Sequence, residues 1–236
     1  MPRSTFRERM ITKYGYDVFF TISTVCFVLA VISIVFLEPK VFRYALLTTA
    51  VVAFCFTLNF FRDPDRTTPS GENLVISPAD GKIILIKEVN ESEFLHAEAT
   101  QISIFMSPLN VHVNRNPTSG TVRHVRYVPG EFFAAFEDKA SEKNEQTIIG
   151  IESRRGKILF KQIAGFVARR IVCTLHPGDE VRAGERFGMI KFGSRVDVFV
   201  PKSAAVKVNI GDVAVAGETV LAEIQLASVV AGTPFR

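Results

Sequence analysis

Two long apolar runs dominate the first quarter of the chain. Residues 18–37 and 44–61 carry no charged side chain, and the short segment between them contains Pro39. A helix of about 20 residues is about 30 Å long, which matches the hydrocarbon core of a bilayer. The pattern therefore predicts a helical hairpin that makes residues 1–61 an N-terminal membrane anchor. An anchor that lies in one leaflet stays open, since both runs contain scattered Ser and Thr and the second is short for a span.

Basic side chains flank this anchor. They precede the first run and follow the second: Arg3, Arg7, Arg9, Lys13, Arg62 and Arg66. Because basic residues near membrane helices stay on the cytoplasmic side, both termini are predicted to be cytoplasmic. A cleaved signal peptide is disfavoured, since the first run is long and no small-residue cleavage site follows it. We therefore expect the rest of the protein at the cytoplasmic face of the cell membrane.

The pattern changes after residue 61. The polar linker RDPDRTTPSGEN is followed by short runs of alternating apolar and polar residues, separated by turn residues. These runs predict strands at 74–76, 82–89, 101–106, 110–113, 120–128, 147–152, 157–163, 170–175, 187–192, 196–200, 205–208 and 219–224. Residues 131–143 are the one segment of this region with a helical pattern. Residues 62–236 are thus predicted to form a mostly-β domain with few short helices.

An internal repeat lies in this domain. GDEVRAGE at 178–185 and GDVAVAGE at 211–218 share six of eight positions, 33 residues apart, and each unit stands between two predicted strands. The pattern resembles the barrel-sandwich hybrid of biotinyl and lipoyl domains, as does SPADGKI at 77–83. The alternative is coincidental turn chemistry, since Gly-Asp and Ala-Gly are common in loops.

Charge and composition limit the classes of molecule that this protein is expected to bind. The net charge of +4 and the pI of about 9.0 suit an anionic partner such as a membrane surface or a phospholipid headgroup. No lysine-rich stripe or known binding motif supports nucleic acid. The three cysteines form no CxxC pair, and their spacing predicts no metal site.

Gly193-Ser194, at the entrance of the predicted strand 196–200, carries the candidate chemistry. Because Gly193 has no side chain, its carbonyl is open to attack by the Ser194 hydroxyl. This N-to-O acyl shift gives an ester, and elimination with hydrolysis would leave a pyruvoyl group on the new N-terminus. On composition alone a Gly-Ser turn is the simpler interpretation. His112, among turn residues, is a candidate base, and Asp80 is either a turn residue or the acid that orients a histidine.

Two other functions fit parts of this pattern. The first is a membrane-anchored adaptor or binding protein without catalysis, although the long heptad hairpin typical of such proteins is missing from the sequence. The second is a biotinyl-type carrier that uses Lys191, which stands in a predicted turn. Lys191 lies between Ile and Phe, whereas carrier lysines normally lie beside Met or Asp.

Several segments together resemble one family, the phosphatidylserine decarboxylases, and its compact bacterial branch in particular. In family order they are FFRDPDR (60–66), SPADGKI (77–83), FMSPLNVHVNRNP (105–117), KASEKNE (139–145), ARRIVC (168–173) and RFGMIKFGSRVDVFVP (186–201). Any one of them is weak, but six in order are specific.

The resemblance implies a self-processing proenzyme cut between Gly193 and Ser194. The products would be a β chain of residues 1–193 and an α chain of residues 194–236, which stay together. Ser194 would become a covalent pyruvoyl group, the cofactor, and metal would not be needed. The amine of phosphatidylserine would form a Schiff base with this group, which accepts electrons as CO₂ leaves, and the product would be phosphatidylethanolamine. A homo-oligomer is compatible with this assignment.

The resemblance also assigns site residues. Asp80 matches the processing aspartate of the family, and His112 matches the histidine of its histidine motif. The longer branch has a second histidine three residues later that activates the serine, and this sequence has Arg115 there. The relay of Asp, His and Ser therefore cannot be carried over unchanged.

Substrate contacts are expected from two further segments. Arg169 and Arg170 are candidates for the phosphate or carboxylate of the lipid. Phe132, Phe133 and Phe136 are candidates for a wedge among the acyl chains. The alternatives are a solvated strand edge for the arginines and core positions for the phenylalanines.

Overall fold

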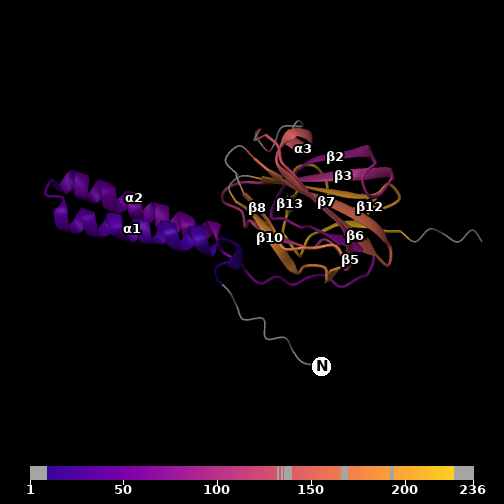
Figure 1. Ribbon diagram of the computed structural model, residues 1–236, viewed down its shortest axis with the longest axis horizontal. Coiled ribbons are helices and arrows are strands. Elements are labelled where there is room, and N and C mark those ends of the chain that lie inside the picture. The colour runs from indigo at the N-terminus through magenta and orange to yellow at the C-terminus, as the bar shows by residue number, and fades with distance from the viewer. Residues whose placement is uncertain are drawn as a thin grey trace, which may run out of the picture.

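The computed structural model describes residues 10–131, 133, 135, 140–165, 170–191 and 194–225. A helical hairpin projects from one side of a β domain (Figure 1). The hairpin consists of a short 3-10 helix, η1 (Lys13–Gly15), and the helices α1 (Tyr16–Phe36) and α2 (Lys40–Phe60). Both predicted helices are confirmed, with starts two to four residues earlier than expected.

The hairpin exposes apolar side chains over most of its length. Both helices are long and apolar enough to cross a membrane, and only 11% of each apolar window is buried inside the protein. At the tip, the Ser33 hydroxyl donates to the Arg43 carbonyl at 2.6 Å, and Arg43 Nε donates to the Leu37 carbonyl at 2.8 Å. These bonds satisfy polar groups where the chain reverses, as an apolar environment requires.

The β domain is built from short strands. They are β1 (Leu74–Ile76), β2 (Gly81–Glu91), β3 (Ala97–Met106), β4 (Val113–Arg115), β5 (Gly120–Val128), β6 (Gln146–Ser153), β7 (Gly156–Ala164), β8 (Arg170–Cys173), β9 (Glu180–Val181), β10 (Arg186–Lys191), β11 (Ser194–Pro201), β12 (Ala205–Val206), β13 (Val213–Ala214) and β14 (Val220–Glu223). All but β9 and β13 overlap a predicted run, β4 at Val113 alone. The mostly-β class is confirmed.

The helix expected over 131–143 is confirmed only at its end, as α3 (Ala140–Lys143), and is wrong at its start. Residues 132, 134 and 136–139 lie outside the described residues. Glu131 instead forms an isolated parallel bridge with Asn144, so this end of the segment runs beside its other end. The helical pattern misleads because tertiary pairing overrides a weak local propensity.

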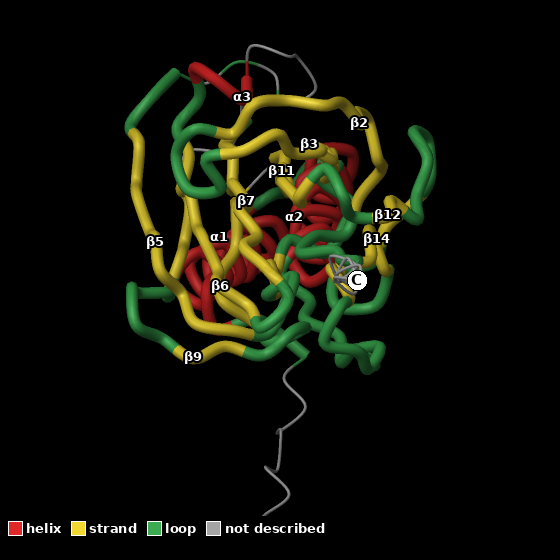
Figure 2. Tube along the Cα trace, turned by 90° about the vertical axis from the view of Figure 1, so that its right-hand side faces the viewer, coloured by secondary structure: helices red, strands yellow, loops and turns green. Residues whose placement is uncertain are grey.

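The sheets form two matching halves. The large sheet has the order β13-β2-β3-β11-β7-β6-β5-β9, and the two small sheets have the orders β1-β14-β12 and β4-β10-β8. Each half contributes four strands of the large sheet, from opposite ends, and one small sheet. Figure 2 shows the large sheet curling around the interior, with the hairpin behind it. The main apolar core lies inside this curl.

The sequence repeat marks equivalent turns in the two halves. Its first glycines, Gly178 and Gly211, have φ angles of +100° and +102°, and its second glycines, Gly184 and Gly217, have +78° and +77°. These left-handed conformations favour glycine, which explains why the repeat keeps it at both positions. The residues between form β9 in one unit and β13 in the other, strands too short to be predicted from alternation.

The chain crosses between the halves twice. It builds β1, β2 and β3 of one half, then β4 to β10 of the other, and then returns to complete the first half with β11 to β14. The return crossing lies between Lys191 and Ser194. The candidate scissile bond therefore lies at the point where the chain re-enters the first half.

The base of the hairpin packs into the β domain. Phe60 and Phe61, at the end of α2, are buried together with Val111, Val113 and Met189. Since this apolar cluster joins residues of both parts, the hairpin is fixed to the domain beside β4 and β10.

Candidate active site

Ser194 begins β11 in the middle of the large sheet. It pairs with Met106 on β3 and with Ala164 on β7, and its side chain is completely buried. The Ser194 hydroxyl donates to the Met106 sulfur at 3.3 Å. A thioether is a weak acceptor, so the hydroxyl is held loosely in a place without bulk water.

Two linked amides lead away from the same sulfur. Asn114 Nδ2 lies 3.9 Å from the Met106 sulfur, and Gln162 Nε2 donates to Asn114 Oδ1 at 2.8 Å. Gln162 Oε1 is buried and has no hydrogen-bond partner among the described residues. A free buried acceptor is costly, so its presence near Ser194 is a sign of chemistry or binding.

His112 is a buried neutral base. It is 0% exposed, and its ring lies on that of Phe60 with 4.1 Å between the ring centroids. Its Nδ1 lies 2.9 Å from the Asn110 carbonyl, which only accepts, so Nδ1 carries the proton and Nε2 the lone pair. Nε2 is buried without a partner among the described residues. Burial lowers the pKa of His112 from 6.5 to about 4, and the nearby Arg62 charge also lowers it.

This lowered pKa predicts a loss of stability in acid. The unfolded state binds a proton on His112 below about pH 6.5, whereas the folded state resists it down to about pH 4. The free energy of unfolding should thus be unaffected by His112 above pH 6.5, and fall by up to about 3 kcal/mol as the pH drops to 4. Thermal unfolding midpoints from pH 4 to 7 measure it, with His112→Gln as the reference that should lack this component. Parallel curves for the two proteins would contradict the assignment.

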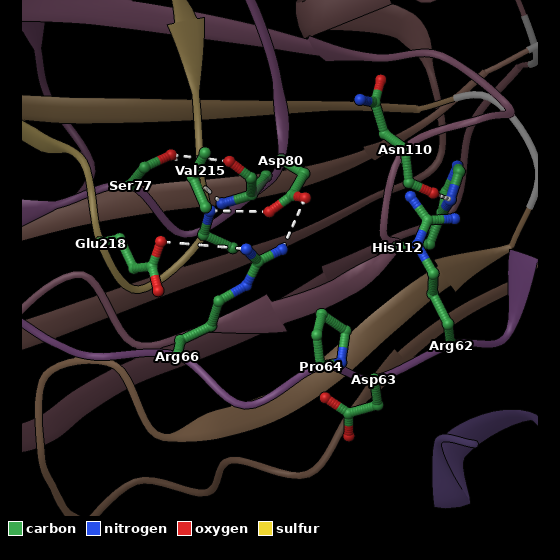
Figure 3. Close-up of polar contacts among 12 residues, drawn as sticks. Arg62, Asp63, Pro64, Arg66, Ser77, Asp80, Asn110, His112, Val215 and Glu218 are labelled. Carbon is green, nitrogen blue, oxygen red and sulfur yellow. Dashed lines mark hydrogen bonds and ion pairs between the residues drawn. The ribbon is translucent and has the colours of Figure 1, made fainter. Parts of the chain in front are cut away.

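Asp80 lies in a separate set of contacts (Figure 3). Its Oδ2 accepts from Arg66 Nη2 at 2.8 Å, and its Oδ1 accepts from the backbone N–H of Ala216 at 2.8 Å. In the other half, the Ser119 hydroxyl accepts from the Ala183 N–H in the same way. Asp80 thus holds the second repeat turn in place, and no contact that the structure records joins it to His112 among the described residues.

Arg115, at the position of the missing second histidine, fastens the linker. It donates to Asp63 Oδ1 at 3.4 Å and to the carbonyls of Pro64 and Gly184. Burial lowers its pKa to about 10, so it stays charged at neutral pH. Arg186 donates to the same Asp63 oxygen at 2.8 Å. The RDPDR segment is therefore a clamp that joins the hairpin to the β domain.

Asp63 and Asp65 offer a matched test of this clamp. The Asp63 carboxylate is 4% exposed and faces two arginines, whereas Asp65 is 55% exposed and pairs with Arg186 alone. Asp63→Ala should lower the free energy of unfolding by about 3–5 kcal/mol, because it leaves buried charges unpaired. Asp65→Ala should cost about 0–1 kcal/mol. Thermal unfolding in one detergent compares them, and equal losses would contradict the clamp.

Of the remaining predicted site residues, the structure describes Arg170 and Phe133, and it tests the role of neither. Arg170 begins β8 and lines a pocket of about 400 Å³ with Lys13, Asp17 and Lys191, where the hairpin meets β8 and β10. Phe133 is half-buried, and its backbone N–H and carbonyl bond to the Asn144 side chain. Gly193, Arg169, Phe132 and Phe136 lie outside the described residues, so their roles stay predictions.

Lys191 does not have the surroundings of a carrier lysine. Its side chain is 5% exposed, and its Nζ lies 3.1 Å from Asp17 Oδ1. A carrier lysine must reach a modifying enzyme and then a distant active site. The carrier hypothesis is therefore disfavoured.

Sequence reasoning missed four residues near Ser194 and His112. Met106 and Asn114 stand in the quoted segment FMSPLNVHVNRNP but were not singled out. Gln162 had a readable signal, since it occupies an inward position of β7 between Phe160 and Ala164. Phe60 lies near the end of the second apolar run, where nothing in the sequence predicts its contact with His112. Among the described residues, no group of three or more His, Cys, Asp or Glu side chains could hold a metal ion.

Comparisons with known proteins identify the family of this chain. The family model described as phosphatidylserine decarboxylase matches residues 54–222. Proteins named phosphatidylserine decarboxylase proenzyme are 46% identical in Chlorobium phaeobacteroides and 47% identical in Chlorobium luteolum, each over 90% of this chain and 99% of the relative. One from Cytophaga hutchinsonii is 44% identical over 90% of this chain and 98% of the relative. A non-catalytic adaptor is therefore set aside, and the chain belongs to the phosphatidylserine decarboxylase family.

Proposed function

We propose that this protein is a self-processing decarboxylase that converts phosphatidylserine to phosphatidylethanolamine and CO₂. Ser194 provides the reacting group, and the products of processing are a β chain of residues 1–193 and an α chain of residues 194–236. Family membership supports the decarboxylation. The burial of Ser194 and the free lone pair of His112 support the self-processing.

Processing begins with the Ser194 oxygen. It attacks the carbonyl carbon of residue 193, the peptide C–N bond breaks, and an ester bond forms, while the proton of the hydroxyl moves to the freed amine. Loss of the Ser194 Cα proton then expels the carboxylate of residue 193. One water enters and one ammonia leaves, which gives a pyruvoyl group on the new chain. Burial of Ser194 supports this course, because it keeps bulk water from hydrolysing the ester directly.

His112 is the base in this proposal. Its Nε2 lone pair has no partner among the described residues, and a pKa of about 4 keeps it unprotonated at neutral pH. Asn114, two residues on, contacts the Met106 sulfur that holds the Ser194 hydroxyl. Asp80 acts at a distance as a positioning residue, since both of its oxygens hold other groups.

The surroundings of Ser194 fit the pyruvoyl group and its substrate. Such a group supplies a ketone that takes up an amine and accepts the electrons released as CO₂ leaves. Gln162 Oε1 and His112 Nε2 are buried acceptors without partners among the described residues, and they suit the N–H groups of an incoming amine. Met106 and Ala164 hold the strand on both sides, which keeps residue 194 fixed between its neighbours.

The anchor places this chemistry at the membrane. In this proposal residues 1–61 insert in the cell membrane and residues 62–236 form the catalytic domain on its cytoplasmic face. The contact of Phe60 with His112 ties the end of the anchor to the proposed base. The lipid substrate then reaches the site without leaving the bilayer surface.

The single observation that carries the proposal is the buried Ser194 hydroxyl, at the Gly-Ser bond where the resemblance to the family implies the cut. Intact mass under denaturing conditions tests it. Two chains are expected, the smaller with the mass of residues 194–236 less one ammonia. Release of CO₂ from phosphatidylserine in detergent micelles should accompany them. A folded protein that stays one unmodified chain would overturn self-processing.

A further inference from the structure

A pocket of about 400 Å³ lies where the base of the hairpin meets the β domain. Lys13 and Asp17 line it from the hairpin, Arg170 from β8 and Lys191 from β10. Arg170 and Lys191 are paired in register on adjacent strands. The pocket thus collects three cations and one carboxylate at the level where the membrane helices end.

Lys191 is the buried member of this set. Its side chain is 5% exposed, and its recorded counter-charge is Asp17, at 3.1 Å. Arg170 also pairs with Asp17, at 3.3 Å, although the Arg170 side chain is 67% exposed. A buried cation needs an anion beside it, and here that anion is itself 56% exposed. Asp17 is therefore in a position where an incoming anion can replace it.

We propose that this pocket binds the phosphate of a phospholipid headgroup, and that Asp17 is a built-in competitor for the same cations. The identity of the ligand rests on the proposed function. Lysine and arginine suit a phosphate oxygen, and the three cations exceed the one carboxylate by two charges. Lys191 precedes Ser194 by three residues, so their Cα atoms lie within about 11 Å along the chain. A headgroup held at Lys191 is thus within reach of the reacting residue.

The proposal gives two substitutions opposite effects. Lys191→Met removes the buried cation and should weaken headgroup binding at least about tenfold. Asp17→Asn keeps the shape and removes the competing charge, so it should tighten binding about threefold. If the Asp17–Lys191 pair were merely structural, both substitutions would change binding in the same direction. Lys207→Met is the matched control, because Lys207 also pairs with a carboxylate, Glu223, away from the pocket.

The experiment measures binding apart from chemistry. Full-length protein with Ser194→Ala, in detergent micelles, is titrated with glycerophosphoserine by calorimetry, alone and combined with each substitution. The expected order of affinity is Asp17→Asn above the parent, Lys207→Met equal to it, and Lys191→Met below both. Weaker binding by the Asp17→Asn protein, or unchanged binding by the Lys191→Met protein, would overturn the proposal.

A parallel titration with inorganic phosphate distinguishes the source of the anion. Glycerophosphoserine should bind more tightly, since its carboxylate adds a second anionic group for the three cations of the pocket. Equal affinity for inorganic phosphate would overturn the headgroup assignment. The proposed function is judged separately, by chain cleavage and CO₂ release in the wild type. Failure there with the binding order intact would overturn the proposed function and leave the phosphate pocket standing.

Discussion

Ser194→Ala is expected to leave the protein as one uncut chain of 236 residues, with CO₂ release from phosphatidylserine at the uncatalysed background. Alanine has no oxygen to attack the preceding carbonyl, so neither the ester nor the pyruvoyl group can form. The exchange removes one buried hydroxyl whose recorded partner is a thioether, so folding should be little affected. Intact mass and a CO₂ assay measure the two outcomes.

Ser203→Ala is the control for this change. Ser203 lies in the exposed turn after β11, in the same C-terminal segment, and has no place in the proposed chemistry. Its variant should be cut and active like the wild type. Two chains in the Ser194→Ala protein, or one chain in the Ser203→Ala protein, would argue against Ser194 as the nucleophile.

His112→Ala is expected to slow the cut by about 10²–10⁴-fold, the usual contribution of a general base. The neutral imidazole carries a lone pair without a partner among the described residues, and it is as fully buried as Ser194. Removing it leaves the Ser194 hydroxyl without that base. A time course of chain cleavage after cell-free synthesis into detergent measures the rate.

Two comparisons separate this role from a structural one. Added imidazole should restore part of the rate, because the substitution leaves a space beside the Phe60 ring that imidazole fits. His124→Ala should be cut normally, since His124 is partly exposed and pairs with Glu93. Cleavage of the His112→Ala protein at the wild-type rate would remove His112 from the mechanism.

The strands could be predicted because runs rich in apolar residues are separated by turn residues. In β11 the alternation of valines with Asp197 and Phe199 locates the element, although the whole strand up to Val200 is buried, Asp197 included. The hairpin follows from two uncharged runs. The strands β9 and β13 were not predicted, because a strand of two residues is too short to show alternation. The prediction of a helix over 131–143 was wrong at Glu131, because this residue pairs with Asn144 just beyond the segment, and a local pattern does not report such pairing.

The candidate site could be predicted only in part, again because local patterns do not report contacts between distant segments. Ser194 and His112 were found through motifs, whereas the surroundings that decide their chemistry come from distant segments. The contact between Phe60 and His112 joins the apolar helix α2 to a loop 52 residues later. The pairing of Asp17 with Lys191 spans 174 residues. Neither partner shows a pattern on its own that would predict the other.

The return crossing of the chain between Lys191 and Ser194 affects whether the processed protein could refold after it unfolds. A cut at Ser194 divides one half of the domain between two molecules, because β11 stays held between β3 and β7 while β14 stays between β1 and β12. The small chain cannot leave without breaking several ladders at once. Once it has left, return requires two separate molecules to meet, which adds an entropic cost that the uncut precursor never had. With the proposed cut, the protein would fold once, as a precursor, and loss of the mature enzyme by unfolding would be governed by a rate rather than by an equilibrium.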